Sequence, residues 1–407
     1  MKDRFQIESL GAQGDGVTSQ GLFIPGSLPG ETVQANPQGH RAELIDVLEA
    51  SADRVQPLCA HFGTCGGCAL QHASDGLLAG WKRDLVFRAL EQRGITGVDI
   101  RPVITSPPGS RRRITLTGRR TKKSAILGFH VAGSDAIVPI SECPVAVPAL
   151  TSKLRGLREL IEVGASRKAE MRLVVTASEA GLDVAAEGGK PVEGGLYGQL
   201  VAIAATKDLA RLSWNGDIVV TRRPPVQHLG PIRVVPPPGG FLQATKEGEE
   251  ALIGQVLQAL RVTGKIADLF AGSGTFSLPL AAQAQVHAFE SEAEAIAALD
   301  EAWRHADGLH HVTAEVRDLY HRPLLAREIS GYDAVVIDPP RQGARAQFEE
   351  LAKADVPVIA SVSCNPATFA RDTRTLIDGG YRLDWVQPVD QFRWSPHVEL
   401  AARLSRT

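Results

Sequence analysis

The chain has 407 residues, of which 43% are hydrophobic and 22% are charged. This composition excludes a disordered chain and a membrane protein, and the length predicts two or three domains. Because 44 Lys and Arg oppose 46 Asp and Glu, any nucleic-acid binding must come from local basic patches. No apolar run reaches signal-peptide or membrane-span length, so we expect a cytoplasmic protein with no membrane partner.

Residues 7–47 alternate short apolar runs with glycine turns. This pattern is typical of a small antiparallel β-barrel, and an irregular glycine-rich arm is the alternative. We place the first domain at residues 1–55.

A compact cysteine-containing loop at 59–68 comes next, followed by a helix predicted over 75–93 and strand-like segments between 111 and 220. Six prolines at 224–238 argue against regular secondary structure there and predict a domain boundary. The middle of the chain is therefore expected to form an α+β domain over 56–238, whose 75–93 helix is free to dock on the domain that follows.

From residue 246 onward, helical and apolar strand patterns alternate. This alternation predicts a doubly wound α/β domain over 239–407, with ligands beyond the carboxyl ends of its parallel strands. The expected strands are 266–270, 286–290, 334–337 and 358–363, and the expected helices include 247–260, 293–305 and 369–378.

The segment 268–276 joins a strand to a helix through two glycines, which lets a ligand approach the backbone closely. A dinucleotide-binding loop would have a third glycine where Ser277 stands, so nicotinamide cofactors are disfavoured. Glu290 ends the next strand, where a carboxylate commonly accepts ribose hydroxyls. The pattern resembles the S-adenosylmethionine site of class I methyltransferases, and a strand–turn–helix with a surface acid is the alternative.

Two further strands end in groups that carry chemistry. The segment Asp338-Pro339-Pro340-Arg341 lacks both the aromatic residue of amino-group methyltransferases and the cysteine of RNA cytosine-5 methyltransferases, which it otherwise resembles. Cys364 follows the next strand, where a nucleophile belongs, although a free cysteine is often only a buried apolar side chain. Glu399, near the C-terminus, could reach the same pocket as a general base.

Five ordered motifs together resemble RNA 5-methyluridine methyltransferases: residues 241–243, 268–276, 338–341, 363–366 and 397–399. The resemblance implies that Cys364 is the nucleophile and Glu399 the base. It also implies that S-adenosylmethionine is contacted by Gln243, Phe270, Thr275, Glu290, Asp318 and Asp338. The segment 392–397 departs from the family pattern, which usually has a proline, a polar residue and a histidine before the final Val-Glu, and this departure bears on how the target base is held.

Uracil C5 is a poor nucleophile, so the Cys364 thiolate must first add to C6 and create an enolate whose C5 attacks the methyl group. Glu399 then removes the C5 proton so that the thiol can leave. Because a free thiol has a pKa of about 8.5, the mechanism predicts a group that lowers the pKa of Cys364, such as Arg341 or a helix N-terminus.

The other cysteines are Cys59, Cys65, Cys68 and Cys143. They are too few and too unevenly spaced for a disulfide framework, and four thiolates suit either a tetrahedral zinc or a [4Fe-4S] cluster. The segment 59–72, with Cys143-Pro144, resembles the iron-sulfur motif of the 23S ribosomal RNA branch of the same family. The resemblance implies a [4Fe-4S] cluster that organises the central domain.

Residues 10–33 are similar to a TRAM domain, a small RNA-binding barrel of OB type, and seven basic residues within 111–123 predict contact with RNA phosphates. A solvated basic face is the alternative for that run. The resemblance implies an RNA uracil-C5 methyltransferase that acts as a monomer, most plausibly on 23S ribosomal RNA, with transfer RNA as the alternative. A non-catalytic RNA-binding assembly factor is the rival from another class, which the intact Cys364 and Glu399 disfavour.

Overall fold

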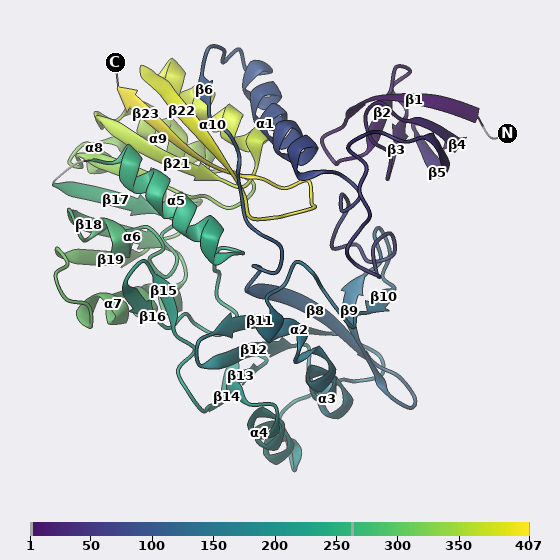
Figure 1. Ribbon diagram of the computed structural model, residues 1–407. Helices are drawn as coiled ribbons and strands as arrows, with labels where there is room; N and C mark the ends of the chain where they lie inside the picture. The colour runs from purple at the N-terminus through teal and green to yellow at the C-terminus, as the bar shows by residue number, and fades with distance from the viewer. Residues whose placement is uncertain (1–2, 262–263, 407) are drawn as a thin grey trace.

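The computed structural model describes residues 3–261 and 264–406, and an N-terminal barrel is its first unit (Figure 1). Its strands close in the order β1-β2-β3-β5-β4. Alternate residues of these strands point inward, so that Ile7, Ile24 and Val33 are fully buried. The predicted barrel is therefore confirmed. The strands are β1 (Asp3–Leu10), β2 (Gly16–Thr18), β3 (Phe23–Ile24), β4 (Thr32–Gln38) and β5 (Arg41–Glu49).

A seven-stranded sheet occupies the middle of the chain, in the order β10-β9-β8-β11-β12-β13-β14. The helix α3 buries Leu157, Leu160 and Ile161, a spacing of three and four that places them on one helical face against β8 and β9. The strands are β8 (Arg113–Arg120), β9 (Ala125–His130), β10 (Ile137–Pro139), β11 (Met171–Ser178), β12 (Gly181–Glu187), β13 (Leu209–Trp214) and β14 (Asp217–Thr221). The helices are α2 (Pro148–Thr151), α3 (Leu154–Gly164) and α4 (Leu196–Thr206).

The proline-rich stretch 224–238 contains a short hairpin, β15 (Gln227–Leu229) and β16 (Ile232–Val234), so the expectation of no regular structure there is wrong. The prolines flank the strands, and Gly230 takes a positive φ of 61° in the turn. Ile232 packs in a cluster that includes Leu278 of the C-terminal part of the chain. Tertiary packing therefore stabilises strands that the local sequence does not favour.

A nine-stranded sheet dominates the C-terminal part, in the order β19-β18-β17-β20-β21-β23-β22-β6, with β7 paired to β22. The strands from β19 to β21 are parallel, whereas β23 is antiparallel to both of its neighbours. The predicted doubly wound sheet is confirmed. The strands are β6 (Asp99–Ile100), β7 (Ile104–Thr105), β17 (Lys265–Leu269), β18 (Gln285–Glu290), β19 (Val312–Val316), β20 (Ala334–Ile337), β21 (Val358–Ser363), β22 (Tyr381–Asp390) and β23 (Glu399–Arg406).

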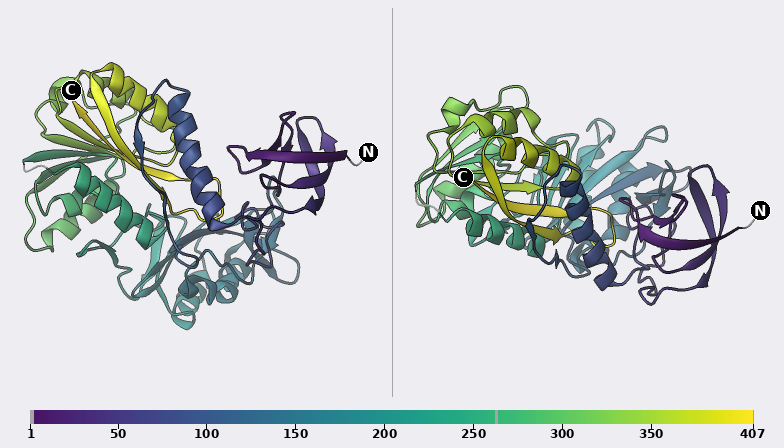
Figure 2. Two further views of the ribbon diagram at one scale, coloured as in Figure 1. Left: turned by 45° about the horizontal axis from the view of Figure 1, so that its top comes forward. Right: turned by 90° about the horizontal axis from the view of Figure 1, so that it is seen from above.

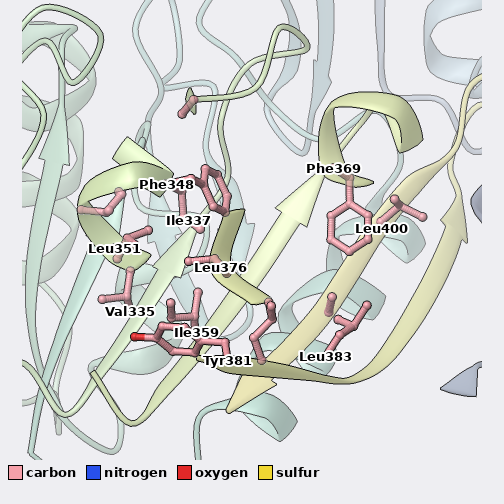
Figure 3. Packing of buried hydrophobic residues seen from close by; sticks show 14 of the residues in the cluster. Val335, Ile337, Phe348, Leu351, Ile359, Phe369, Leu376, Tyr381, Leu383 and Leu400 are labelled. Atoms are coloured by element: carbon pink, nitrogen blue, oxygen red, sulfur yellow. The ribbon is translucent and has the colours of Figure 1, made fainter. Parts of the chain in front are cut away.

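Helices cover both faces of this sheet, because alternate residues of each strand point to opposite sides. In β20, Val335 and Ile337 belong to a cluster that includes Phe348 and Phe369 (Figure 3). Val336 belongs to a second cluster, which includes residues of α5 and α7. The helices are α5 (Lys246–Ala259), α6 (Ser277–Leu280), α7 (Ala293–Arg304), α8 (Ala326–Ile329), α9 (Arg345–Lys353) and α10 (Pro366–Asp378).

Helix α1 (Asp75–Glu91) lies between the barrel and the C-terminal sheet (Figures 1 and 2). Its Val86 and Leu90 belong to the core under the nine-stranded sheet, while Trp81 packs in a cluster with Leu10 of the barrel. The strands β6 and β7 follow it and pair with β22. Residues 75–105 therefore lie with the C-terminal sheet, although the sequence pattern placed them within the range of the central domain.

Candidate active site

A cavity of about 460 Å³ opens at the carboxyl ends of the parallel strands. Parallel strands deliver the residues that follow them to one edge of a sheet, so segments far apart in the chain meet there. All the residues predicted to bind the cofactor or to catalyse the reaction line this cavity: Gln243, Phe270, Thr275, Glu290, Asp318, Asp338, Cys364 and Glu399.

The turn after β17 brings backbone to the cavity wall. Phe270 takes a positive φ of 65°, and its N–H and that of Ala271 both donate to the carbonyl of Phe289, at 3.0 and 3.1 Å. Such a φ costs a non-glycine residue roughly 1–3 kcal/mol and is concentrated at functional sites. The next amide, of Gly272, donates to Glu290 Oε2 at 3.0 Å, so the strained turn and the acid at the end of β18 hold each other in place.

Aromatic side chains form part of the wall. The rings of Phe270 and Tyr320 are 5.5 Å apart and inclined by 53°, and the Tyr320 hydroxyl donates to the carbonyl of Gly343 at 3.0 Å. Asp318 accepts the N–H of Tyr320, and hydrogen bonds from His321 lower the pKa of its carboxyl. Tyr320 was not predicted, and in the sequence only its position two residues after Asp318 indicates it.

Two acids interact at this edge of the sheet: Asp338, which is half-buried and lines the cavity, and Asp268, which is fully buried. Desolvation raises the pKa of Asp338 to about 7, and the nearby Asp268 adds to the shift. Asp268 itself is inaccessible to solvent, and its pKa is also raised to about 7 by desolvation, although Ser277 Oγ donates to it at 2.5 Å. Gln243 Nε2 lies 3.5 Å from Asp338 Oδ2, and Gln391 Nε2 donates to Gln243 Oε1 at 2.5 Å. Gln391 was also missed, and it fixes the amide of Gln243.

Cys364 and Glu399 lie on adjacent strand ends. Cys364 follows β21, Glu399 begins β23, and the antiparallel register pairs Ser363 with Leu400, so the two reactive side chains face the same cavity. Desolvation, together with a smaller effect of the neighbouring Asp338, raises the pKa of Glu399 to about 8.

Desolvation also raises the pKa of the Cys364 thiol to about 12, with added effects of Glu399 and Asp338. The expectation of a lowered thiol pKa is therefore wrong for the protein without ligands. Arg341 acts in the predicted direction, but its effect is smaller than that of burial. Helix α10, which begins at Pro366, does not bring the pKa of the Cys364 thiol below its usual value.

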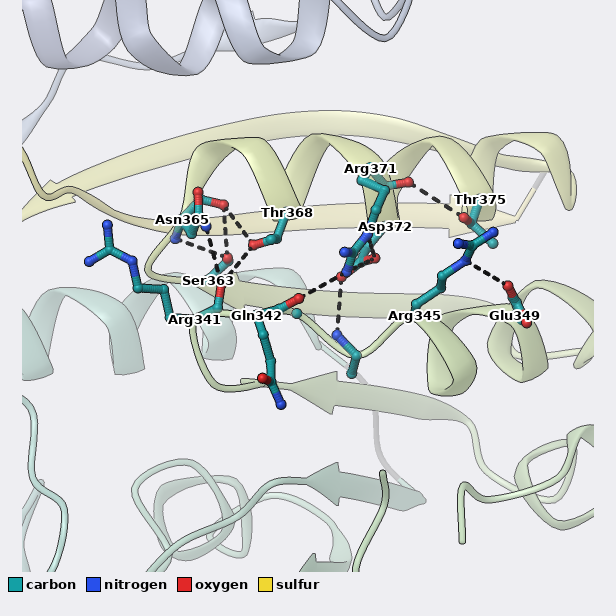
Figure 4. Close-up of polar contacts among 12 residues, drawn as sticks. Arg341, Gln342, Arg345, Glu349, Ser363, Asn365, Thr368, Arg371, Asp372 and Thr375 are labelled. Carbon is teal, nitrogen blue, oxygen red and sulfur yellow. Dashed lines mark hydrogen bonds and ion pairs between the residues drawn. The ribbon is translucent and has the colours of Figure 1, made fainter. Parts of the chain in front are cut away.

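The loop after β20 is tied to the start of α10, as Figure 4 shows. The carbonyl of Arg341 accepts hydrogen bonds from Asn365 Nδ2 and Thr368 Oγ1, both at 3.2 Å, and Arg371 donates to the carbonyl of Gln342 at 3.1 Å. These contacts use the backbone of Arg341 and leave its guanidinium to point away from α10.

The atypical segment 392–397 is anchored at Phe392 and at Trp394. Lys82 of α1 and Asp390 form a buried ion pair of 2.6 Å, and Lys82 Nζ also donates to the carbonyl of Phe392 at 3.2 Å. Trp394 is buried with a φ of 60°, and its carbonyl accepts the N–H groups of Ala69 and Leu70 at 2.9 and 3.1 Å. The segment that leads to Glu399 is therefore held by α1 and by the cysteine loop.

The four remaining cysteines line a second cavity, of about 560 Å³. None of them forms a disulfide, and desolvation raises the pKa of Cys59 and Cys65, and that of Cys68 to about 11. Within residues 3–261 and 264–406, no group of three or more His, Cys, Asp or Glu side chains is arranged to hold a metal ion. The ligand set of Cys59, Cys65, Cys68 and Cys143 therefore stays a prediction.

The basic run 111–123 does not form one phosphate-binding face. Arg112 is buried in an ion pair with Glu249, and Arg113 Nη2 donates to the carbonyl of Gly239 at 3.0 Å. Arg119 pairs with Glu170. Alternate side chains along this run point to opposite faces of the sheet, so some of the basic side chains point into the protein. There they connect the central sheet to Gly239, which lies before α5, and to Glu249 of α5.

Among the described residues, no helix combines the length and the apolar character that crossing a membrane requires.

Comparisons with known proteins agree with this geometry. The tRNA (uracil-5-)-methyltransferase family matches residues 237–407. An uncharacterized RNA methyltransferase of Brucella melitensis is 45% identical over 98% of this chain and 97% of its own, and the 23S rRNA (uracil(1939)-C(5))-methyltransferase RlmD of Halomonas elongata is 31% identical over 97% and 87%. The crystal structure of Pyrococcus abyssi tRNA (uracil-54, C5)-methyltransferase in complex with S-adenosyl-L-homocysteine superposes with a TM-score of 0.77 at 27% identity, covering 98% of this chain and 99% of that one. Since two of these relatives exceed 30% identity over nearly its full length, the chain belongs to the S-adenosylmethionine-dependent RNA uracil-C5 methyltransferase family.

Proposed function

We propose that the chain methylates C5 of uridine in 23S ribosomal RNA, with Cys364 as the nucleophile and Glu399 as the base. One observation carries this proposal: a thiol and a carboxyl group on adjacent strand ends face the same cavity as the predicted cofactor loop. A nucleophile and a base are the two groups that methylation of an unactivated pyrimidine carbon requires.

The cavity suits S-adenosylmethionine in its chemistry. Glu290 stands at the end of β18, where ribose hydroxyls are bound in folds of this kind, and the backbone of Gly272 lines the cavity beside it. The ring of Phe270 offers a face for the adenine base. When bound, the cofactor supplies the methyl group on a cationic sulfur. The residues that we propose hold it are Gln243, Phe270, Thr275, Glu290, Asp318 and Asp338.

The proton balance follows from the pKa values of the site. Near neutral pH, Cys364 and Glu399 are mostly protonated, because desolvation raises their pKa to about 12 and about 8. A positive charge in the cavity favours the ionised forms of both groups and of Asp338. The Cys364 thiolate then adds to C6 of uracil, and the electron pair of the C5–C6 double bond moves into an enolate.

Once C5 carries the methyl group, it still bears its hydrogen. The Glu399 carboxylate accepts that proton, the C5–H electron pair re-forms the double bond, and Cys364 leaves as the thiolate. The Cys364 proton goes to solvent when the thiolate forms, and the C5 proton goes from Glu399 to solvent after the step, so that a thiolate and a carboxylate are ready for another turnover.

RNA containing 5-fluorouridine tests the mechanism, because fluorine at C5 cannot leave as a proton. The wild-type chain should form an RNA adduct that survives a denaturing gel, and Cys364→Ala should form none. An adduct on Cys364→Ala, or no adduct on a wild-type chain that binds the cofactor, would favour the assembly-factor alternative.

The choice of RNA rests on the relatives. The relative described as acting on 23S rRNA matches nearly the whole chain, barrel included, and the one described as acting on tRNA matches it equally far. Incubating unmodified 23S ribosomal RNA and transfer RNA transcripts with methyl-labelled cofactor decides between them. Label in the ribosomal transcript alone supports the proposal, and label in transfer RNA alone replaces it.

We also propose that the four cysteines bind a [4Fe-4S] cluster and that the barrel binds RNA as a TRAM domain. Four thiols around one cavity supply the donor chemistry of such a cluster. The barrel turn between β1 and β2 reaches the same region, because Gln13 lines the cysteine cavity.

A further inference from the structure

A groove of about 370 Å³ opens on the outer side of Cys364. It shares Cys364 and Arg341 with the cavity that we propose holds S-adenosylmethionine, which we call the cofactor cavity. The predicted nucleophile can therefore be approached from two directions. Besides Arg341 and the start of α10, its walls come from the barrel turn at Gln13, the end of α1 at Arg88 and Gln92, and the segment before β23 at His397. We call this space, defined by these six residues, the outer groove.

The groove carries positive charge that the protein does not neutralise. Among the described residues, neither Arg88 nor Arg341 has a carboxylate within ion-pair distance. The Arg341 guanidinium lies 3.2 Å from His397 Nδ1, and desolvation together with nearby cations lowers the pKa of that imidazole. His397 is therefore neutral near pH 7 and adds no charge of its own.

Three nearby arginines outside the groove have partners within the protein. Arg393 pairs with Asp75 at 2.5 Å, Arg371 pairs with Asp372 at 2.8 Å, and Arg83 donates to the carbonyl of Ile100 at 2.9 Å. Arg88 and Arg341, which have no carboxylate partner, thus both line a space that ends at Cys364. This arrangement is complementary to an anionic chain that must deliver one group to Cys364.

We infer that the outer groove holds the single-stranded RNA next to the target uridine, with its phosphates at Arg88 and Arg341. This inference rests on the proposed function. A uridine in folded RNA must leave the stack to reach Cys364, so its neighbours have to be held just outside the pocket. The volume is at the lower end of ligand sites, which leaves room for one nucleotide unit of a single strand. The side-chain amides of Gln13 and Gln92 can meet the edges of a flanking base.

Charge reversal at Arg88 tests the inference, with Arg93→Glu as the matched control. Arg93 lies just beyond the same end of α1 and is exposed, but it does not line the groove. Both variants make the same change in net charge and lose the same kind of interaction with the helix C-terminus. The measurement is the Kd for a short fluorescein-labelled oligouridylate, which needs no turnover.

We expect Arg88→Glu to weaken binding about tenfold, whereas Arg93→Glu should change it less than about twofold. For Arg88→Ala, the slope of log Kd against log salt should fall by about 0.7, the value for one phosphate contact on a single strand. With a transcript that the wild-type chain methylates, Arg88→Glu should raise the KM for RNA and leave kcat and the KM for the cofactor nearly unchanged.

Equal effects of Arg88→Glu and Arg93→Glu on the Kd would overturn the groove assignment, even if the Cys364 adduct forms as proposed. Conversely, loss of the Cys364 adduct with intact Arg88-dependent binding would overturn the catalytic proposal and keep the groove. Unchanged thermal unfolding of each variant shows that binding, rather than folding, was altered.

Discussion

At the scale of single residues, Cys364 and Glu399 form a pair whose roles can be separated. In the proposed mechanism, thiol addition comes before methyl transfer and proton removal after it, so loss of the base should stop the reaction late. We expect Glu399→Gln to lower multiple-turnover methylation by at least about 10²-fold. It should also accumulate a covalent adduct with ordinary uridine RNA. A denaturing gel detects the adduct, and the absence of any band, with turnover lost, would move Glu399 out of the proton-removal step.

The same pair predicts a pH profile. Glu399 acts only as a carboxylate, and its pKa is raised to about 8, so its active fraction grows as the pH increases. Because kcat/KM reports the free enzyme, in which the pKa of the Cys364 thiol is raised to about 12, this ratio should rise about a hundredfold per pH unit below pH 8 and about tenfold per unit above it. Formation of 5-methyluridine, measured from pH 6 upward in buffers of constant ionic strength, checks the profile. A rise of only about tenfold per unit on both sides of pH 8 would mean that Glu399 is already ionised before RNA binds.

At the scale of elements, the docking of α1 depends on the buried pair of Lys82 and Asp390. Removing one member of a buried ion pair leaves the other charge without compensation, at a cost of roughly 3–5 kcal/mol. Lys82→Met should therefore destabilise the protein by that amount in urea unfolding. Lys353→Met is the control, because its pair with Glu350 is exposed and should cost less than about 1 kcal/mol. Similar losses in both variants would contradict a special role for α1 docking.

The elements also show which parts of the fold the sequence can predict. β20 and β21 have the predicted bounds, since each is a short apolar run buried on both faces by helices. β6, β7 and the β15–β16 hairpin were not predicted, because two- and three-residue strands owe their existence to partners distant in the chain. The inward turn of Arg112 has the same cause, since its partner Glu249 is on α5.

At the scale of the whole molecule, the predicted site residues meet because parallel strand ends converge at one edge of a sheet. Tyr320, Gln391 and Lys82 were missed, because their roles depend on contacts between segments that no local pattern links. The high thiol pKa of Cys364 was also unforeseen, since a sequence does not report how deeply a strand end is buried.

The cysteine cavity is lined by residues of the barrel, of the central sheet and of the segment 392–397 that leads to Glu399. If it holds a [4Fe-4S] cluster, protein purified without oxygen should be brown and contain about four iron and four sulfide per chain. Cys68→Ser should lose most of that iron, whereas Cys364→Ser, which alters the cysteine outside this cavity, should keep it. Stoichiometric zinc in a colourless preparation, or full iron content in Cys68→Ser, would exclude the cluster.

Removing the iron should also loosen residues 392–397, the segment that leads to Glu399. The residues directly after Cys68 donate two backbone hydrogen bonds to the carbonyl of Trp394, and Phe392 lines both the cysteine cavity and the cofactor cavity. Loss of the cluster frees the cysteine loop and thereby weakens the hold on residues 392–397. We expect hydrogen exchange at these residues to accelerate after chelation, while the strands β20 and β21 keep their protection. Unchanged exchange at 392–397 would show that the backbone contacts persist without iron and that the cluster serves the central sheet alone.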